Sequence, residues 1–255
     1  MIEICNLTKR YGDKLALFEL SLNLKAGEVF AFLGPNGAGK TTTIKILAGL
    51  VRPTSGRAAI GGYDITSQSL AAKALMSYVP DEPFLYDKLT AREFLRMIGD
   101  LYGMPRERVE ERSARMIEIF ELENFIDDLS ESFSHGMKQR TVLAAALLHE
   151  PKLLVIDEPM VGLDPKSART AKDLLRKLAT EQGLTVFMST HTLSVAEEVA
   201  DRIGILSQGR LVALGTLTEL RELKSKHEHA GHQRLEDLFL ELTAGDSNGN
   251  GAPKT

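Results

Sequence analysis

The eight residues GPNGAGKT, at positions 34–41, restrict the fold of this chain more than any other feature. They fit the pattern G-x-x-x-x-G-K-[ST] and follow directly after the apolar run Val29–Leu33, which is typical of a buried strand. A helical pattern at 42–50 comes next. A strand, a glycine-rich loop and a helix in this order predict an α/β fold with a parallel sheet around a P-loop core.

The loop also predicts a ligand. Its glycines allow backbone N–H groups to surround a β-phosphate, and the helix N-terminus adds its positive dipole end. The Lys40 ammonium would reach β- and γ-phosphate oxygens, and the Thr41 hydroxyl would bind Mg²⁺. A chance glycine turn is disfavoured, because a buried strand precedes the loop. We therefore expect ATP and Mg²⁺ as cofactors, with ATP bound by Gly34, Pro35, Asn36, Gly37, Ala38, Gly39, Lys40, Thr41 and Thr42.

A pair of carboxylates follows a second apolar strand pattern, at 153–156. The end of a strand beside a phosphate loop is where magnesium needs an acidic partner, so Asp157 is the predicted metal residue. Glu158 would then orient and deprotonate the attacking water. The alternative is that the pair only caps the next turn. The phosphate loop favours the catalytic interpretation.

His191 follows a third buried strand pattern, at 185–188. A lone histidine is more often structural than catalytic. Its place after this strand favours a catalytic role instead, in which a ring nitrogen hydrogen-bonds the γ-phosphate.

The order of patterns along the chain predicts one nucleotide-binding domain, residues 1–220, with a P-loop NTPase core, an antiparallel β lobe near the N-terminus and a helical lobe at about 84–150. Thr90 is a suitable N-cap, and the segment 103–105 (Gly-Met-Pro) separates two helices. A helical extension at 221–244 and a disordered tail at 245–255 are expected to follow.

Charge and cysteine content exclude several classes of protein. The 31 basic and 35 acidic residues give a net charge of -4 without a long single-sign block, which argues against a nucleic-acid partner and a polybasic membrane surface. Cys5 is the sole cysteine, so no internal disulfide framework exists. No apolar run approaches the ~20 residues that span a bilayer. We expect a cytoplasmic protein that reaches a membrane only through a partner.

Two further motifs, FSHGMKQR at 133–140 and EPMVGLDP at 158–165, complete a set. With them, residues 1–220 resemble the ATP-binding subunit of an ABC transporter, and the ending RLEDLFLELT is similar to that of exporter-type subunits. The resemblance assigns the signature to 133–137, the D-loop to 161–164, the histidine switch to His191 and the adenine-stacking aromatic to Tyr11.

The resemblance implies a head-to-tail dimer of two nucleotide-binding subunits. Ser134, His135, Gly136 and Met137 of one subunit would then contact ATP on the loop of the other. It also implies integral membrane subunits as partners, a location at the inner face of the cell membrane, and ATP-driven transport of a small molecule, with export favoured over import. A soluble ATPase acting on ribosomes or DNA is the alternative. A P-loop kinase would leave the signature, the D-loop and His191 without a role.

Two positions depart from the family pattern. His135 stands where the signature has a glycine; it would crowd the phosphate, donate a hydrogen bond to it or, the favoured interpretation, turn to solvent. Asp81 stands where a glutamine usually contacts Mg²⁺; its carboxylate can still bind the metal but adds repulsion near the γ-phosphate.

Two weaker candidates have ordinary explanations as well. Tyr11 is either an adenine-stacking side chain, which we favour, or a simple strand aromatic. His227, His229 and His232 lie in a polar stretch without cysteine, so a solvated linker is favoured over a metal site.

Overall fold

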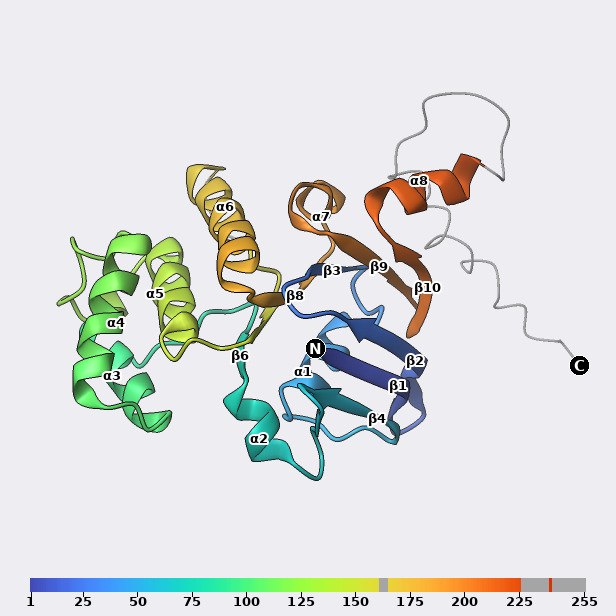
Figure 1. Ribbon diagram of the computed structural model, residues 1–255, viewed down its shortest axis with the longest axis horizontal. Coiled ribbons are helices and arrows are strands. Elements are labelled where there is room, and N and C mark those ends of the chain that lie inside the picture. The colour runs from blue at the N-terminus through green and yellow to red at the C-terminus, as the bar shows by residue number, and fades with distance from the viewer. Residues whose placement is uncertain (161–164, 226–238, 240–255) are drawn as a thin grey trace, which may run out of the picture.

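The computed structural model describes residues 1–160, 165–225 and 239. Its strands form an antiparallel sheet and a mainly parallel sheet. The helices α3 (Ala91–Leu101), α4 (Arg106–Ile119) and α5 (His135–Leu147) form a lobe at the end of the molecule opposite the antiparallel sheet (Figure 1). The predicted combination of an α/β core, an antiparallel β lobe and a helical lobe is confirmed.

The antiparallel sheet holds the N-terminal part of the chain. Its order is β2-β1-β4-β5. The sequence predicted the first two strands but not the other two, because β4 begins with the small or polar residues Ser-Gly-Arg and β5 is only a dipeptide. The four strands are β1 (Ile2–Tyr11), β2 (Lys14–Leu24), β4 (Ser55–Ile60) and β5 (Tyr63–Asp64).

The second sheet has the order β10-β9-β3-β8-β7-β6, in which β9 to β6 are parallel and β10 is antiparallel. The carboxyl ends of parallel strands lie at the same edge, so the segments that follow β3, β7 and β8 come together there. The strands are β3 (Val29–Leu33), β6 (Met76–Val79), β7 (Leu153–Asp157), β8 (Thr185–Thr190), β9 (Arg202–Ser207) and β10 (Arg210–Gly215).

The central strand β3 belongs to two cores. Phe30 and Phe32 pack with Phe187, at ring-centroid distances of 5.5 and 5.4 Å, in a core shared with the antiparallel sheet and with α1 (Lys40–Leu47). The alternate residues of β3 face the other core, which includes α6 (Pro165–Gln182), α7 (Leu193–Val199) and the helical lobe. Because β3 is buried on both faces, its sequence is apolar throughout.

Local chemistry sets the helix boundaries. Thr90 forms a capping box with Glu93 at the start of α3, as its predicted N-cap role requires. The helix predicted at 42–50 instead runs from Lys40 to Leu47. It starts early because Gly39, at φ 111°, turns the loop directly into the helix, and it ends early because Gly49, at φ +66°, bonds back to Ile46.

The remaining helices are short. They are α2 (Ser69–Ala74), the 3₁₀ turn η1 (Ser130–Ser132) and α8 (Leu217–Ser225). None of the helices within the described ranges is long and apolar enough to cross a membrane. The predicted D-loop at 161–164, the histidines at 227, 229 and 232, nearly all of the extension beyond α8 and the predicted tail lie outside the described residues.

Candidate active site

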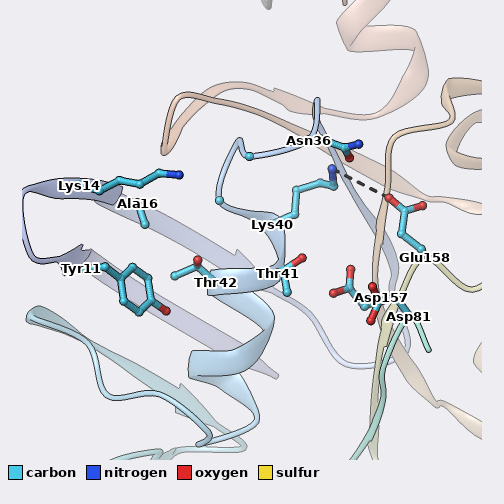
Figure 2. Close-up of a pocket in the computed structure, with 12 residues that line it drawn as sticks. Tyr11, Lys14, Ala16, Asn36, Lys40, Thr41, Thr42, Asp81, Asp157 and Glu158 are labelled. Carbon is cyan, nitrogen blue, oxygen red and sulfur yellow. Dashed lines mark ion pairs between the residues drawn. The ribbon is translucent and has the colours of Figure 1, made fainter. Parts of the chain in front are cut away.

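A cavity of about 370 Å³ opens between the glycine-rich loop, the start of the antiparallel lobe and the end of β7 (Figure 2). Most of the predicted ATP and metal residues meet here. Three predicted residues of the loop, Gly34, Pro35 and Ala38, do not line the cavity. Ala38 is buried in the core, and the carbonyls of Gly34 and Pro35 accept hydrogen bonds from Lys40. The cavity is lined by Tyr11, Lys14, Ala16, Asn36, Gly37, Gly39, Lys40, Thr41, Thr42, Asp81, Asp157 and Glu158.

At two positions of the loop there is no room for a side chain, so only glycine fits. A Cβ at Gly34 would lie 2.4 Å from the Leu206 carbonyl oxygen. A Cβ at Gly39 would lie 2.6 Å from the Ala16 carbonyl oxygen, at a positive φ that side chains rarely adopt. A side chain at either position would therefore clash with the backbone that packs against the loop.

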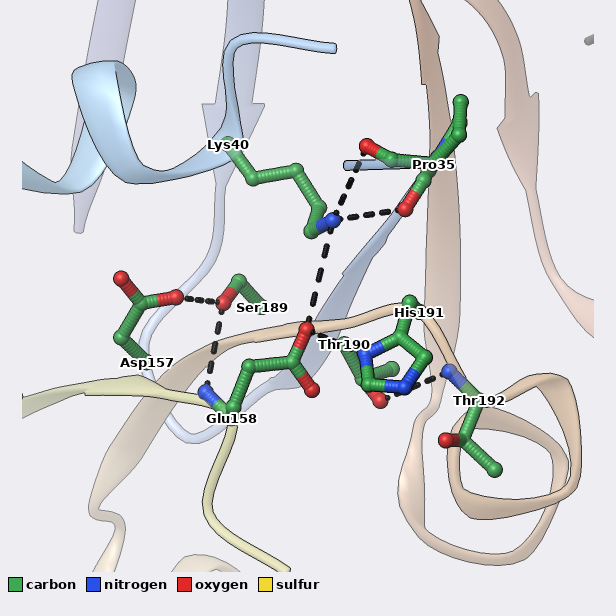
Figure 3. A network of polar contacts seen from close by, with 9 residues as sticks. Pro35, Lys40, Asp157, Glu158, Ser189, Thr190, His191 and Thr192 are labelled. Carbon is green, nitrogen blue, oxygen red and sulfur yellow. Dashed lines mark hydrogen bonds and ion pairs between the residues drawn. The ribbon is translucent and has the colours of Figure 1, made fainter. Parts of the chain in front are cut away.

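The Lys40 side chain is buried and crosses the loop. Its Nζ donates to the Gly34 carbonyl at 2.6 Å and the Pro35 carbonyl at 3.2 Å, and it lies 4.0 Å from Glu158 Oε1 (Figure 3). Burial lowers the pKa of Lys40, while Glu158 and Asp157 oppose that shift. Because neutral carbonyls hold this buried ammonium, it can exchange them for the negatively charged oxygens of a phosphate, which are stronger acceptors.

Asp157 ends β7 and is 2% exposed. Its Oδ1 accepts a hydrogen bond from the Ser189 hydroxyl, whereas its buried Oδ2 has no hydrogen-bond partner among the described residues. An orphaned carboxylate oxygen beside the Thr41 side chain fits a Mg²⁺ ligand. No group of three His, Cys, Asp or Glu side chains gathers within the described ranges, so a metal here would depend on phosphate and water ligands as well.

Glu158 directly follows β7 in a left-handed backbone conformation, φ 48°. For a residue with a β-carbon this conformation costs about 1–2 kcal/mol. Bonds from its N–H to Ser189, at 3.2 Å to the carbonyl and 3.4 Å to the hydroxyl, hold it there. The Oε1 of Glu158 lies 2.8 Å from Nδ1 of His191, which follows β8 (Figure 3). The two predicted catalytic residues are therefore in direct contact.

Asp81 is exposed and lines the same cavity, next to Asp157 in Figure 2. Tyr78 lies on β6, the strand next to β7. Burial, with the negative charges of Asp157 and Asp81, raises the pKa of Tyr78 to about 12. Asp81 thus shares the cavity with Asp157, the predicted metal residue.

Tyr11 lies at the far end of the cavity from Asp157. The Lys9 ammonium stands 4.8 Å from its ring centroid and donates to the Arg52 carbonyl at 2.8 Å. Sequence reasoning did not find Lys14 and Ala16, which line this end, or Ser189, which holds Asp157 and Glu158. Their signals were weak: Lys14 and Ala16 lie just after Tyr11, and Ser189 lies two residues before His191.

The signature segment lies outside the ATP cavity. Ser134 is the N-cap of α5 and accepts a hydrogen bond from the Met137 N–H at 3.3 Å. Ser134, Gly136 and Met137 line neither that cavity nor the groove beside it. His135 does line this groove, of about 580 Å³, together with Asn36, Asp81, Glu82, Pro83, Lys138, Glu158 and His191.

The sequence motifs and this geometry agree with a family model described as ABC transporter, which matches residues 17–161. The chain belongs to this family. As an ABC ATPase, it binds and hydrolyses ATP and is the ATP-binding subunit of a transporter.

Relatives of this ABC ATPase include transport and resistance proteins. The linearmycin resistance ATP-binding protein LnrL of Bacillus subtilis is 42% identical over 86% of the chain and 70% of that protein. The ABC-type transporter ATP-binding protein EcsA, also of Bacillus subtilis, is 35% identical over 97% of the chain and 98% of that protein. The chain spans only 41% of a third relative, the probable multidrug ABC transporter ATP-binding protein YbhF of Escherichia coli, at 37% identity.

Solved structures agree with the fold. The ATP-binding subunit of an ABC transporter matches with a TM-score of 0.86 and 33% identity, over 95% of this chain and 99% of that one. A dimeric post-hydrolysis state of the cassette MJ0796, bound to ADP and Pi, matches with a TM-score of 0.77 and 30% identity, over 85% of this chain and 99% of that one. These relatives give no support to the alternative of a soluble ATPase acting on ribosomes or DNA.

Proposed function

We propose that this ABC ATPase powers the export of a small molecule through separate integral membrane subunits, working as a dimer at the cytoplasmic face of the membrane. The observation that carries the ATP-hydrolysing part is a convergence of side chains: Lys40, Asp157 and Glu158 line one cavity, and His191 contacts Glu158 from the groove beside it. Export is supported by the relatives, among them a bacitracin transport protein of Bacillus licheniformis and a daunorubicin/doxorubicin resistance protein of Streptomyces peucetius.

In this proposal the cavity binds ATP with its base near Tyr11 and its phosphates on the loop. Lys40 exchanges its bonds to the Gly34 and Pro35 carbonyls for bonds to β- and γ-phosphate oxygens. Thr41, Asp157 and Asp81 would hold Mg²⁺, which when bound neutralises charge on the phosphates.

Glu158 is the proposed general base. Its carboxylate accepts a proton from the water that attacks the γ-phosphate, while the contact between Nδ1 of His191 and Oε1 fixes the orientation of the carboxylate. His191, half-exposed at the mouth of the site, is placed to donate a ring N–H to the γ-phosphate. The positive φ of Glu158 aims this side chain from the strand end into the site.

The site of one chain is proposed to be completed by Ser134, His135, Gly136 and Met137 of a second copy. In each chain the start of α5 offers the Ser134 hydroxyl and the N-terminal end of a helix dipole, which suits the γ-phosphate. Space at Gly136 is open, since a Cβ there would meet nothing within 4 Å. A partner nucleotide can therefore approach this backbone closely.

The test uses Glu158→Gln, which keeps the shape of the side chain and removes its basicity. ATP turnover should fall at least ~10²-fold while ATP still binds. ATP should then dimerise this variant in analytical ultracentrifugation, and ADP should not, because the second copy grips the γ-phosphate. Lys40→Ala is the control that removes nucleotide binding itself.

A second substitution separates the two halves of the proposal. Ser134→Arg in the Glu158→Gln background should block the dimer while each monomer still binds ATP, because Ser134 lies outside the ATP cavity of its own chain. Turnover that falls less than severalfold in Glu158→Gln would assign the base to another residue. If that variant stays monomeric with ATP but His135→Gly restores the dimer, His135 weakens the signature; continued failure shows that membrane subunits must bring the copies together.

A further inference from the structure

A second cavity, of about 460 Å³, lies at the junction between the helical lobe and the parallel sheet. It shares no lining residue with the ATP cavity. Helix α4 and the end of α5 form one side, and α6 with the turn at 182–184 forms the other; Figure 1 shows these helices where the lobe meets the core. Its volume is within the range of about 300–1,000 Å³ typical of small-ligand sites.

Polar and apolar atoms share the wall of this cavity about equally, and the apolar side chains come from both of its sides. Buried side chains from both sides meet there, so an apolar ligand body would exchange water for aliphatic and aromatic surface. The apolar lining residues are Met116, Ile119, Phe120, Leu147, Pro151, Leu174, Leu178 and Leu184.

The rim is basic. Arg112, Arg115 and Lys152 line it, against the single carboxylate of Glu150. That carboxylate is already paired twice, with Arg108 at 2.6 Å and with Arg112 at 3.2 Å. The side chains of Arg115 and Lys152 form no hydrogen bond or ion pair with described residues. The cavity therefore carries positive charge that its own carboxylate does not neutralise.

The Arg112 side chain is held in one position by hydrogen bonds to the backbone. It is 5% exposed, and it donates to the Leu147 carbonyl at 3.2 Å and the Leu148 carbonyl at 3.3 Å, at the end of α5. Burial lowers the pKa of Arg112; Glu150 opposes this shift, while Arg115 and Arg108 add to it. A negative charge placed at this rim would be stabilised by all three lining cations.

We propose that this cavity binds a small amphiphilic anion, a molecule with a short apolar body and one carboxylate, sulfonate or phosphate group. The apolar body lies against Met116, Leu174 and Leu178, and the anionic group pairs with Arg115 and Lys152. Because the walls come from both the helical lobe and the core, the ligand holds the two together. The proposal does not depend on the transported substrate.

The probe is decanoate, titrated into the full chain by calorimetry below its micelle concentration. Saturable 1:1 binding is expected. Decanol and decylamine, which match its apolar body but lack the negative charge, should bind at least ~10-fold more weakly. Anionic phospholipid vesicles in a sedimentation assay distinguish a lipid headgroup in a bilayer from a free amphiphile as the source of the anion.

Matched variants locate the site. Arg115→Glu with Lys152→Glu should weaken decanoate binding at least ~10-fold, while Arg106→Glu, on the same helix outside the cavity, should not. The chain has no tryptophan, so Leu174→Trp places a single indole on the cavity wall, and decanoate should shift its emission. Lys40→Ala should bind decanoate normally, even though the proposed function predicts that it loses ATP.

The proposal fails if decanol binds as tightly as decanoate, if binding does not saturate, or if the charge reversals leave the affinity unchanged. It also fails if Leu174→Trp, folded by circular dichroism, shows no response to saturating decanoate.

Discussion

The loop glycines offer a matched test of how tightly the phosphate loop is built. Gly37 and Gly39 both have positive φ, +81° and +111°. A Cβ at Gly37 would meet nothing within 4 Å, whereas a Cβ at Gly39 would lie 2.6 Å from the Ala16 carbonyl and 2.7 Å from a Leu17 methyl. Alanine at either position is strained, but only at Gly39 does it also clash.

The expected loss of stability follows from the cost of a positive φ and, at Gly39, the cost of the clash. Positive φ costs alanine about 1–2 kcal/mol, so Gly37→Ala should destabilise by about that amount. Relieving the clash at Gly39 requires the backbone or Leu17 to move, which typically costs a further 1–3 kcal/mol or so. The free energy of unfolding of Gly39→Ala should therefore be lower by roughly 2–5 kcal/mol.

Urea unfolding followed by circular dichroism measures both variants against the unsubstituted chain. We expect an ordered series of midpoints, with Gly39→Ala lowest and similar m-values throughout. Equal midpoints for the two variants would refute the reasoning, because the close approach of the loop to Ala16 would then have no energetic consequence.

Three further predictions concern single side chains. Burial lowers the pKa of His149 to about 4 from 6.5, so unfolding should become easier as pH falls from 6.5 towards 4. His149→Phe should lose this part of the acid sensitivity when urea midpoints at pH 7 and 4.5 are compared. Asp81→Gln should change the Mg²⁺ dependence of ATP hydrolysis, and superimposable metal titrations would place Asp81 outside the metal site. Lys9→Met should weaken ATP binding by about 2–5-fold but leave inorganic triphosphate binding unchanged, because the Lys9 ammonium lies over the Tyr11 ring and does not line the cavity that holds the phosphates; calorimetry compares the two ligands.

Much of the fold was accessible from sequence because its central elements have strong local signals. The uniformly apolar β3 and the Thr90 cap each matched a pattern that few other structures produce. Strand β6 was missed, although it completes the parallel sheet. Its sequence, MSYV, is only four residues long and mixes polar with apolar residues, so it matches neither an apolar run nor a regular alternation.

The site shows the same division. Lys40 was predicted because it belongs to the glycine-rich motif, and Asp157 and Glu158 because they end or directly follow a recognisable strand. Ser189 was not predicted, because its role depends on the register of β7 and β8, which sets it opposite Asp157. Contacts made across a sheet between segments distant in sequence have no local signature. The groove lined by His135 is non-local in the same way, because its walls come from distant parts of the sequence.

The double burial of β3 has a consequence for hydrogen exchange. Phe30 and Phe32 belong to one core, and Val29, Ala31 and Leu33 belong to the other. The strand can open to solvent only when both cores separate, so its backbone amides should exchange with deuterium among the slowest in the protein. An opening confined to the helical lobe would leave the amides of β3 protected from exchange. The phosphate-binding loop, which follows β3, would then remain attached to a folded strand.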